Sequence, residues 1–223
     1  MSASPSGWWT APARRWRTGR TWPTGTRPWP TTTAATTREP RPRLRPEHVS
    51  HKEAQMTENP SDRPSSDLDR VPAEQRWRLH RVLPHPSSRI YQALMDPELL
   101  PHWYGPQGWS VHPESLELDP RPGGIRRFAM VMDDDPQMGA PSHGRHAAIV
   151  PEEMLEIQEA LPGPDGEPTE HLILLRIELV PVDGGTRIEL LQGPLPKEVH
   201  ATAKGAWDSS LDRLRALLDS RES

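Results

Sequence analysis

The segment between residues 90 and 127 constrains the fold most, because several different structural signals follow one another there with hardly a spare residue. An apolar helical face ends at Asp96-Pro97, since a residue before proline is pushed out of the α region. A second short helix can begin at this proline and is closed by Gly105-Pro106. A strand and the turn at Gly123-Gly124 come next. This compact order predicts one small α+β domain.

Most of the remaining chain shows the two-residue alternation of apolar and polar side chains that is typical of β-strands. A first strand begins near Trp77 and is stopped by Pro84, after which Ser87 or Ser88 can cap the following helix. From Trp109 the chain is expected to be β almost to its end, with turn residues between the strands. The expected later strands cover residues 125–132, 144–150, 155–161, 171–180 and 186–191.

The C-terminal segment predicts one long amphipathic helix. Pro196 can occupy its first turn, and apolar residues then recur at intervals of four, four, three and four. These residues form a continuous stripe along about four helical turns: Ala203, Trp207, Leu211, Leu214 and Leu218. The order of elements therefore predicts a curved antiparallel β-sheet around a long C-terminal α-helix, with two short helices after the first strand.

The N-terminal third has a different composition. Residues 1–55 contain only Leu44 and Val49 as aliphatic core formers, while Trp, Thr, Pro and Arg dominate, so no packed core is expected there. Interleaved Trp and Arg could serve a nucleic-acid-binding arm, but a disordered tail is favoured. Out-of-frame translation of GC-rich DNA is a third interpretation, in which the native protein begins at Met56. The expected division is an extension at 1–55, a polar linker at 56–73 and a domain at 74–223.

Charge and cysteine content limit the classes of partner. Residues 1–55 carry ten Lys and Arg against three Glu, whereas the rest of the chain has 17 basic and 28 acidic residues. An acidic domain argues against nucleic acid as the partner of residues 74–223. The chain has no Cys, which excludes disulfides and thiolate chemistry and favours a cytoplasmic setting. No apolar run is long enough to span a bilayer, and no secretory signal is indicated.

Five motifs in order resemble a known family. They are A-L-M-D-P-E-L-L-P-H-W-Y-G-P at 93–106, D-P-R-P-G-G-I-R-R at 119–127, G-R-H-A-A-I-V-P at 144–151, G-G-T-R-I-E-L at 184–190 and A-W-D-S-S-L-D-R-L at 206–214. Their order and spacing resemble the SRPBCC (START-like, helix-grip) superfamily, in the branch related to the activator of the heat-shock-protein-90 ATPase. The resemblance covers roughly residues 75–220. It implies a long helix gripped by the sheet, in agreement with the pattern of elements above.

A helix-grip fold can hold an apolar ligand in a cavity between the concave face of the sheet and the long helix. Met130 and Met132 are the strongest candidates for its lining, because flexible thioethers adapt to irregular ligands. For any single candidate, however, an ordinary place in the core is the favoured interpretation. The complete set of predicted lining residues is Trp103, Trp109, Phe128, Met130, Met132, Ile173, Leu175, Trp207 and Leu211.

Few residues suggest catalysis, a metal or a cofactor. Glu159 shares the parity of the apolar residues in its strand, so burial could raise its pKa and make it an acid or base. Because it lies near the end of the strand, a solvated position or a bulge is favoured over this role. His143 and His146 are three apart in a predicted strand and therefore lie on opposite faces, which argues against a metal pair. Asp133-Asp134-Asp135 is interpreted as a solvated turn. We expect no metal and no cofactor.

Three functions are compatible with these observations. A binding protein for a small apolar or aromatic ligand is favoured, because catalytic constellations are scarce. A co-chaperone-like activator of a heat-shock-protein-90 ATPase is the alternative that the resemblance implies, with a chaperone as the partner. The second alternative is an enzyme of the cyclase or hydratase type with Glu159 in its cavity. The sequence favours a non-enzymatic role over an enzyme and leaves the oligomeric state open.

Overall fold

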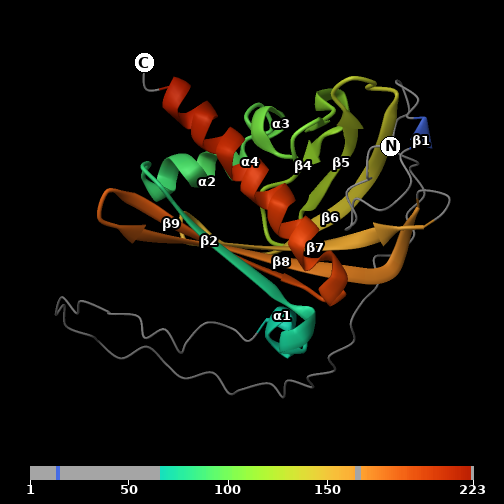
Figure 1. Cartoon of the computed structure of the whole chain (residues 1–223), viewed down its shortest axis with the longest axis horizontal. Helices are drawn as coiled ribbons and strands as arrows, with labels where there is room; N and C mark the ends of the chain where they lie inside the picture. Colours follow the sequence, from blue (N-terminus) through green and yellow to red (C-terminus); the bar gives the residue numbers. More distant parts are fainter. Residues whose placement is uncertain (1–13, 16–65, 164–166, 222–223) are drawn as a thin grey trace, which may run out of the picture.

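The computed structural model describes residues 14–15, 66–163 and 167–221 (Figure 1). Most of the predicted extension 1–55, and the expected native start at Met56, lie outside these residues. The packed part begins at Ser66, inside the segment predicted as a linker, because Leu68 is buried against the sheet. The predicted division into an extension, a linker and a domain stays a prediction.

The sheet confirms the predicted antiparallel architecture. In the described part of the chain, nine strands form one sheet, with the order β2-β9-β8-β7-β6-β5-β3, while β4 pairs with β5 and β1 pairs with β6. Every pairing is antiparallel. The strands are β1 (Arg14–Arg15), β2 (Trp77–Leu83), β3 (Trp109–Val111), β4 (Glu117–Leu118), β5 (Ile125–Met132), β6 (Met138–Val150), β7 (Met154–Pro162), β8 (Pro168–Val182) and β9 (Gly185–Gly193).

Three helices cover one side of the sheet, and α4 runs across it as the longest of them (Figure 1). The short helix α1 lies on the other side of the sheet, where it contacts β8. The helices are α1 (Asp67–Arg70), α2 (Ser87–Met95), α3 (Leu100–Trp103) and α4 (His200–Ser220). Short 3₁₀ turns are η3 (Ala73–Gln75), η4 (Pro113–Ser115) and η5 (Lys197–Val199).

The core lies between α4 and the face of the sheet that we call the inner face. All five residues of the predicted stripe on α4 are buried, which confirms the helical register. On β8, Ile173, Leu175 and Ile177 are buried, whereas Arg176 and Glu178 point to the outer face. Full burial of one such aliphatic side chain is worth about 1.5–3 kcal/mol, so this contact stabilises the whole domain.

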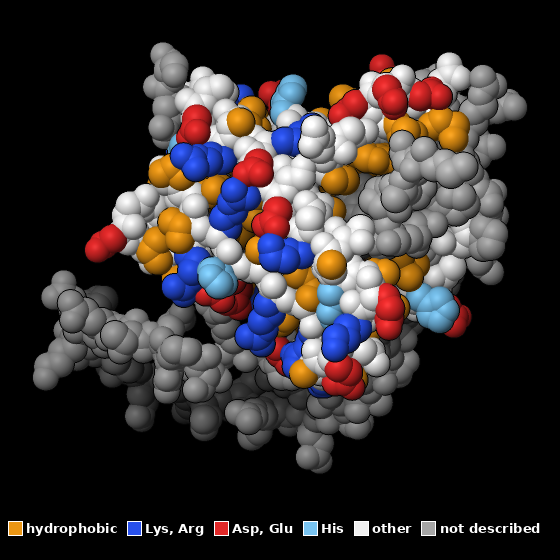
Figure 2. Space-filling view, viewed as in Figure 1, with side chains coloured by type: hydrophobic (Ala, Val, Ile, Leu, Met, Phe, Trp, Pro, Cys, Tyr) orange, Lys and Arg blue, Asp and Glu red, His pale blue; other side chains and the backbone are white. Residues whose placement is uncertain are grey.

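The exposed side of α4 is charged. Lys and Arg side chains are interspersed with Asp and Glu over the face that α4 presents to solvent (Figure 2). Lys204 pairs with Asp208 at 2.5 Å, and Arg215 pairs with Asp219 at 3.6 Å, both one helical turn apart. Such exposed pairs add little stability, so the apolar stripe, and not the charged side, determines how α4 is held.

Several details differ from the expected boundaries. The N-cap of α2 is Pro86, and no side-chain hydrogen bond caps the helix, so neither Ser87 nor Ser88 has the predicted role. Pro196 precedes the 3₁₀ turn η5, and α4 begins only at His200. β6 begins at Met138, six residues before the predicted start, because it pairs with β5 across the expected loop.

Arg213 fastens α4 to the segment between α3 and β3. Its guanidinium donates hydrogen bonds to the backbone carbonyls of Trp109 (2.6 Å), Gly105 (3.2 Å) and His102 (3.4 Å). These carbonyls belong to residues 102–109, the segment at and after the end of α3 that we call the aromatic corner. One side chain therefore connects this segment to α4.

Replacing Arg213 tests this attachment. We expect Arg213→Ala to lower the free energy of unfolding by about 1–3 kcal/mol, because the partly buried carbonyls of Gly105 and Trp109 lose a charged donor. The matched control Arg215→Ala removes an exposed arginine on the same helix and is expected to change stability by no more than about 0.5 kcal/mol. Urea denaturation measures both, and equal effects of the two substitutions would contradict the proposed attachment.

Candidate functional site

A buried arginine lies on the inner face of β5. Arg126 is only 2% exposed and alternates with Phe128 and Met130, which are both part of the core. Its neighbour Arg127 is half-buried and forms an ion pair with Glu117 at 2.6 Å. The strand pattern predicts Phe128 and Met130 on one face, and the same parity places Arg126 with them. Arg126 is therefore a residue that the pattern could have identified but that the predicted set omits.

Arg126 and Glu159 lie in the same transverse row of the inner face. The sheet register aligns Arg126 of β5 with Gly144 of β6, and Gly144 with Glu159 of β7. Gly144 has no side chain, so nothing projects from the sheet between the arginine and the carboxylic acid. The next residue in the row is Ile173 of β8, where the apolar part of the inner face continues.

Two aromatic rings lie against the guanidinium of Arg126. Its Cζ atom lies 4.6 Å from the ring centroid of Tyr104 and 5.0 Å from that of Phe128. Tyr104 also contacts Trp207 of α4 edge to face, with the centroids 5.6 Å apart. Burial raises the pKa of the Tyr104 hydroxyl, against the opposing charge of Arg126, so the phenol stays neutral at ordinary pH. Cation–π contact stabilises the guanidinium here without neutralising its charge.

The hydrogen bonds of Arg126 are incomplete. Its Nε and Nη1 atoms are buried and have no hydrogen-bond partner among the described residues. No described Asp or Glu lies within ion-pair distance of it either; the nearby ion pairs belong to Arg121 and Arg127. An arginine stays protonated even when buried, so Arg126 places a positive charge in the core without an anion beside it.

Glu159 is buried together with a hydroxyl donor. The Ser142 hydroxyl donates a hydrogen bond to Oε1 of Glu159 over 2.5 Å. Burial raises the pKa of the Glu159 carboxyl, while the bond from Ser142 and the charge of Arg126 act in the opposite direction. A buried carboxyl with a raised pKa could exchange protons with a bound molecule, but a catalytic role of Glu159 stays a prediction.

His146 adds an unused acceptor to the same region. Its Nδ1 lies 2.9 Å from the carbonyl oxygen of Asp119, which can only accept, so Nδ1 carries the proton and Nε2 is a bare acceptor. That Nε2 is buried without a hydrogen-bond partner among the described residues. Burial lowers the pKa of His146, and the charge of Arg126 lowers it further, so the neutral ring is favoured. His143, three residues earlier, is half-buried.

Most of the predicted cavity residues belong to the packed core. Trp103, Phe128, Met130, Ile173, Leu175, Trp207 and Leu211 are buried, while Trp109 and Met132 are half-buried. Trp103 donates its indole N–H to the carbonyl of Ala93 at 2.9 Å and therefore has a structural role. The indole N–H of Trp207 has no partner among the described residues. An apolar cavity lined by this set stays a prediction.

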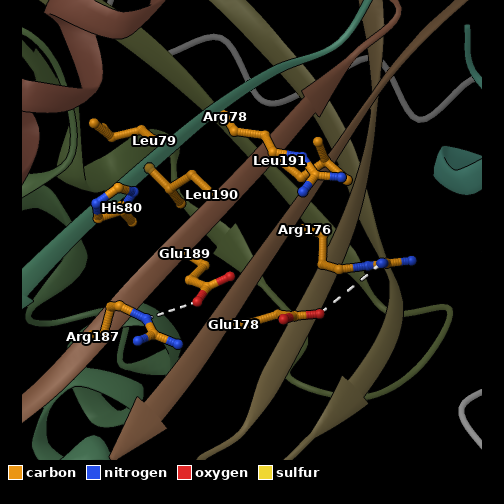
Figure 3. A pocket seen from close by; sticks show the side chains of 9 residues that line it. All are labelled: Arg78, Leu79, His80, Arg176, Glu178, Arg187, Glu189, Leu190 and Leu191. Atoms are coloured by element: carbon orange, nitrogen blue, oxygen red, sulfur yellow. Dashed lines mark hydrogen bonds and ion pairs between the residues drawn. The ribbon is translucent and has the colours of Figure 1, made fainter. Parts of the chain in front are cut away.

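A hollow of about 360 Å³ lies on the outer face of the sheet instead (Figure 3). Its charged walls are largely internally paired: Arg187 with Glu189 at 2.7 Å, and Arg176 with Glu156 at 2.6 Å and with Asp69 at 3.0 Å. Because these charges already satisfy one another, this hollow offers a weaker basis for ligand recognition than the unpaired groups of the interior.

Other candidate groups have ordinary surroundings. Asp133, Asp134 and Asp135 are exposed, as the predicted solvated turn requires. The Ser210 hydroxyl donates to the carbonyl of Ala206, and the Ser209 hydroxyl accepts from the backbone of Gln107. Among the residues that the structure describes, no group of three His, Asp or Glu side chains is arranged to hold a metal ion. No helix in the described ranges is long and apolar enough to cross a membrane.

The raised pKa of Glu159 predicts how stability depends on pH. The folded state holds this proton more tightly than the unfolded chain, so stability falls as the pH rises above the ordinary value of 4.5 and through the folded-state pKa. Glu159→Gln keeps an acceptor for Ser142 and removes this titration. We expect the variant to lose less stability than the wild type over that pH range.

Urea midpoints measured from about pH 4 to pH 9 check this difference in slope. Glu114→Gln is the control, because Glu114 is exposed and its replacement removes a carboxylate from the surface. Parallel stability curves for the wild type and Glu159→Gln would show that the buried carboxyl does not titrate as described.

Comparison with known proteins shows the family of the chain. Residues 84–219 match the family model described as activator of Hsp90 ATPase homolog 1-like protein. Among proteins with curated functions, none matches the chain at a significant level. A solved structure of a protein from Chromobacterium violaceum is 29% identical, with a TM-score of 0.56, and the match covers 64% of this chain and 96% of that one.

Two further structures have the same fold. A protein from Nitrosomonas europaea is 25% identical with a TM-score of 0.58, covering 68% of this chain and 99% of that one. The AHSA1 protein from Silicibacter pomeroyi is 21% identical with a TM-score of 0.59, covering 66% and 99%, and this likeness shows the fold alone. Because the family model spans more than half of the chain and the predicted helix-grip fold is present, the protein belongs to the activator of Hsp90 ATPase homolog 1-like family.

Proposed function

We propose that this protein binds a small apolar or aromatic molecule between the inner face of the sheet and α4. The observation that carries this proposal is the set of buried polar atoms without partners in an otherwise apolar interior. They include Nε and Nη1 of Arg126, Nε2 of His146 and Nε1 of Trp207; further such atoms in the described residues are Nε1 of Trp77, Nδ1 of His112 and Oε1 of Gln192. Buried polar groups in folded proteins are nearly always hydrogen-bonded, so the unpaired atoms of Arg126 and its neighbours support the binding of another molecule there.

The surroundings of these atoms support recognition of a molecule with an apolar body. Phe128, Met130 and Leu211 supply apolar surface from both β5 and α4. Methionine side chains can change their shape with little strain, which permits the interior to adjust around a guest. Small-molecule sites commonly combine such an apolar lining with a few well-placed polar groups.

Ligand screening by thermal shift tests this function. Aromatic and decyl-chain compounds that bind only the folded state are expected to raise the melting temperature, and a ligand at one hundred times its Kd stabilises by about 2.7 kcal/mol. Met130→Trp is expected to fill the interior and remove the shift. Val82→Trp places a tryptophan at an exposed position of β2 and is expected to keep the shift.

Overpacking of the core can itself cost about 1–3 kcal/mol, so the melting temperature of Met130→Trp without ligand is measured first. A ligand that shifts the wild type and Met130→Trp equally binds elsewhere, and the interior site would then be wrong.

A co-chaperone role is the second candidate, because the family description names activators of the Hsp90 ATPase. The exposed charged side of α4 supports contact with a protein partner, since it is solvent-facing and independent of the interior (Figure 2). In this role the domain would act through its surface, without a small molecule.

Measuring the ATPase rate of a purified Hsp90 with and without the full chain tests this candidate. The co-chaperone role predicts a higher rate, and it predicts the same increase with Met130→Trp, which alters only the interior. An unchanged ATPase rate at saturating concentrations would count against it.

A further inference from the structure

The charge of Arg126 distinguishes the interior from an ordinary apolar core. Transfer of a cation from water into a protein interior is costly unless an anion and hydrogen bonds compensate it. Here the aromatic rings of Tyr104 and Phe128 give partial compensation. Two of the three guanidinium nitrogens nevertheless have no acceptor among the described residues.

Glu159 does not supply the missing anion. Its Oε1 atom is bound to the Ser142 hydroxyl, and no ion pair joins it to Arg126, although both lie in one row of the sheet. Burial raises the pKa of this carboxyl, against the hydrogen bond from Ser142 and the charge of Arg126. The positive charge of Arg126 is therefore available to an anion from outside the chain.

Nearby groups define which anion fits. The indole of Trp207 offers a second unpaired N–H donor, and its ring contacts Tyr104, which lies over Arg126. One cation and one neutral donor match the two oxygens of a group that carries a single negative charge. A dianion such as a phosphate monoester would add a second buried charge, which nothing among these residues neutralises.

We propose that Arg126 binds the carboxylate of an apolar or aromatic acid, with the indole N–H of Trp207 as a second donor. The apolar body of this acid lies along the inner face toward Ile173, which continues the row beyond Glu159, and toward Leu175, two residues further along β8. This inference rests on the proposed interior site and adds the chemical class of the ligand to it.

Matched pairs of probes separate the two proposals. The carboxylates are naphthalene-2-carboxylate and decanoate, and their neutral counterparts are naphthalene-2-carboxamide and decan-1-ol. Binding of each is measured by calorimetry or thermal shift on the full chain. We expect the wild type to bind each carboxylate at least about tenfold more tightly than its neutral counterpart, because a charge-assisted hydrogen bond is worth that difference or more.

Two substitutions on one strand provide the matched variants. Arg126→Met keeps an unbranched apolar stem and removes the charge, so carboxylate affinity is expected to fall about tenfold or more, while the affinity for the neutral probes stays the same. Arg127→Met removes the neighbouring arginine, which is paired with Glu117, and is expected to leave all four affinities unchanged. Arg126→Lys keeps the positive charge but lacks the planar set of N–H donors of a guanidinium, so it is expected to retain part of the carboxylate affinity.

Each outcome decides between the proposals. Equal binding of the carboxylates and their neutral counterparts by the wild type would overturn the role of Arg126 and leave the interior site standing. Binding of none of the four probes would overturn both proposals. Because the comparison of probes on the wild type is decisive by itself, a variant that fails to fold does not remove the test.

Discussion

Contact between the apolar stripe of α4 and the inner face of the sheet is the constraint on which the rest of this structure depends. The sheet is antiparallel and has charged residues such as Arg176 and Glu178 on its outer face, so its apolar side must be covered. α4 provides that cover, and Arg213 connects it to the aromatic corner after α3. The rings of Tyr104, Phe128 and Trp207 come into contact only because the aromatic corner, β5 and α4 meet.

Because this interior is apolar, the burial of the positively charged Arg126 in it needs an explanation. The same burial that stabilises Leu211 or Phe128 removes water from the guanidinium, and replacing a buried charge by an apolar side chain is often neutral or stabilising. A buried charged residue of which two nitrogens have no acceptor among the described residues is better explained by function than by stability. Arg187 and Arg176 in the outer hollow need no such functional explanation, because both have acidic partners.

The sequence predicts the elements well where local periodicity and burial agree. Residues 125–132 form β5 with the expected bounds, and the stripe from Ala203 to Leu218 is buried throughout. The start of β6 could not be predicted, because Pro141 argues against a central strand and only its long-range pairing with Ala129 of β5 places it there. The alternation of β5 places Arg126 on the inner face, but a charged residue is ordinarily assigned to solvent. Two of its nitrogens lack acceptors among the described residues, and this appears only in the three-dimensional structure.

A crystal structure of the protein grown with naphthalene-2-carboxylate tests the central claim most directly. It is predicted to show the carboxylate against the guanidinium of Arg126, with the naphthalene ring between β5, β8 and α4. Electron density for the compound only in the outer hollow lined by Arg78 and Arg187, or an ordered water molecule as the sole partner of Arg126, would contradict it.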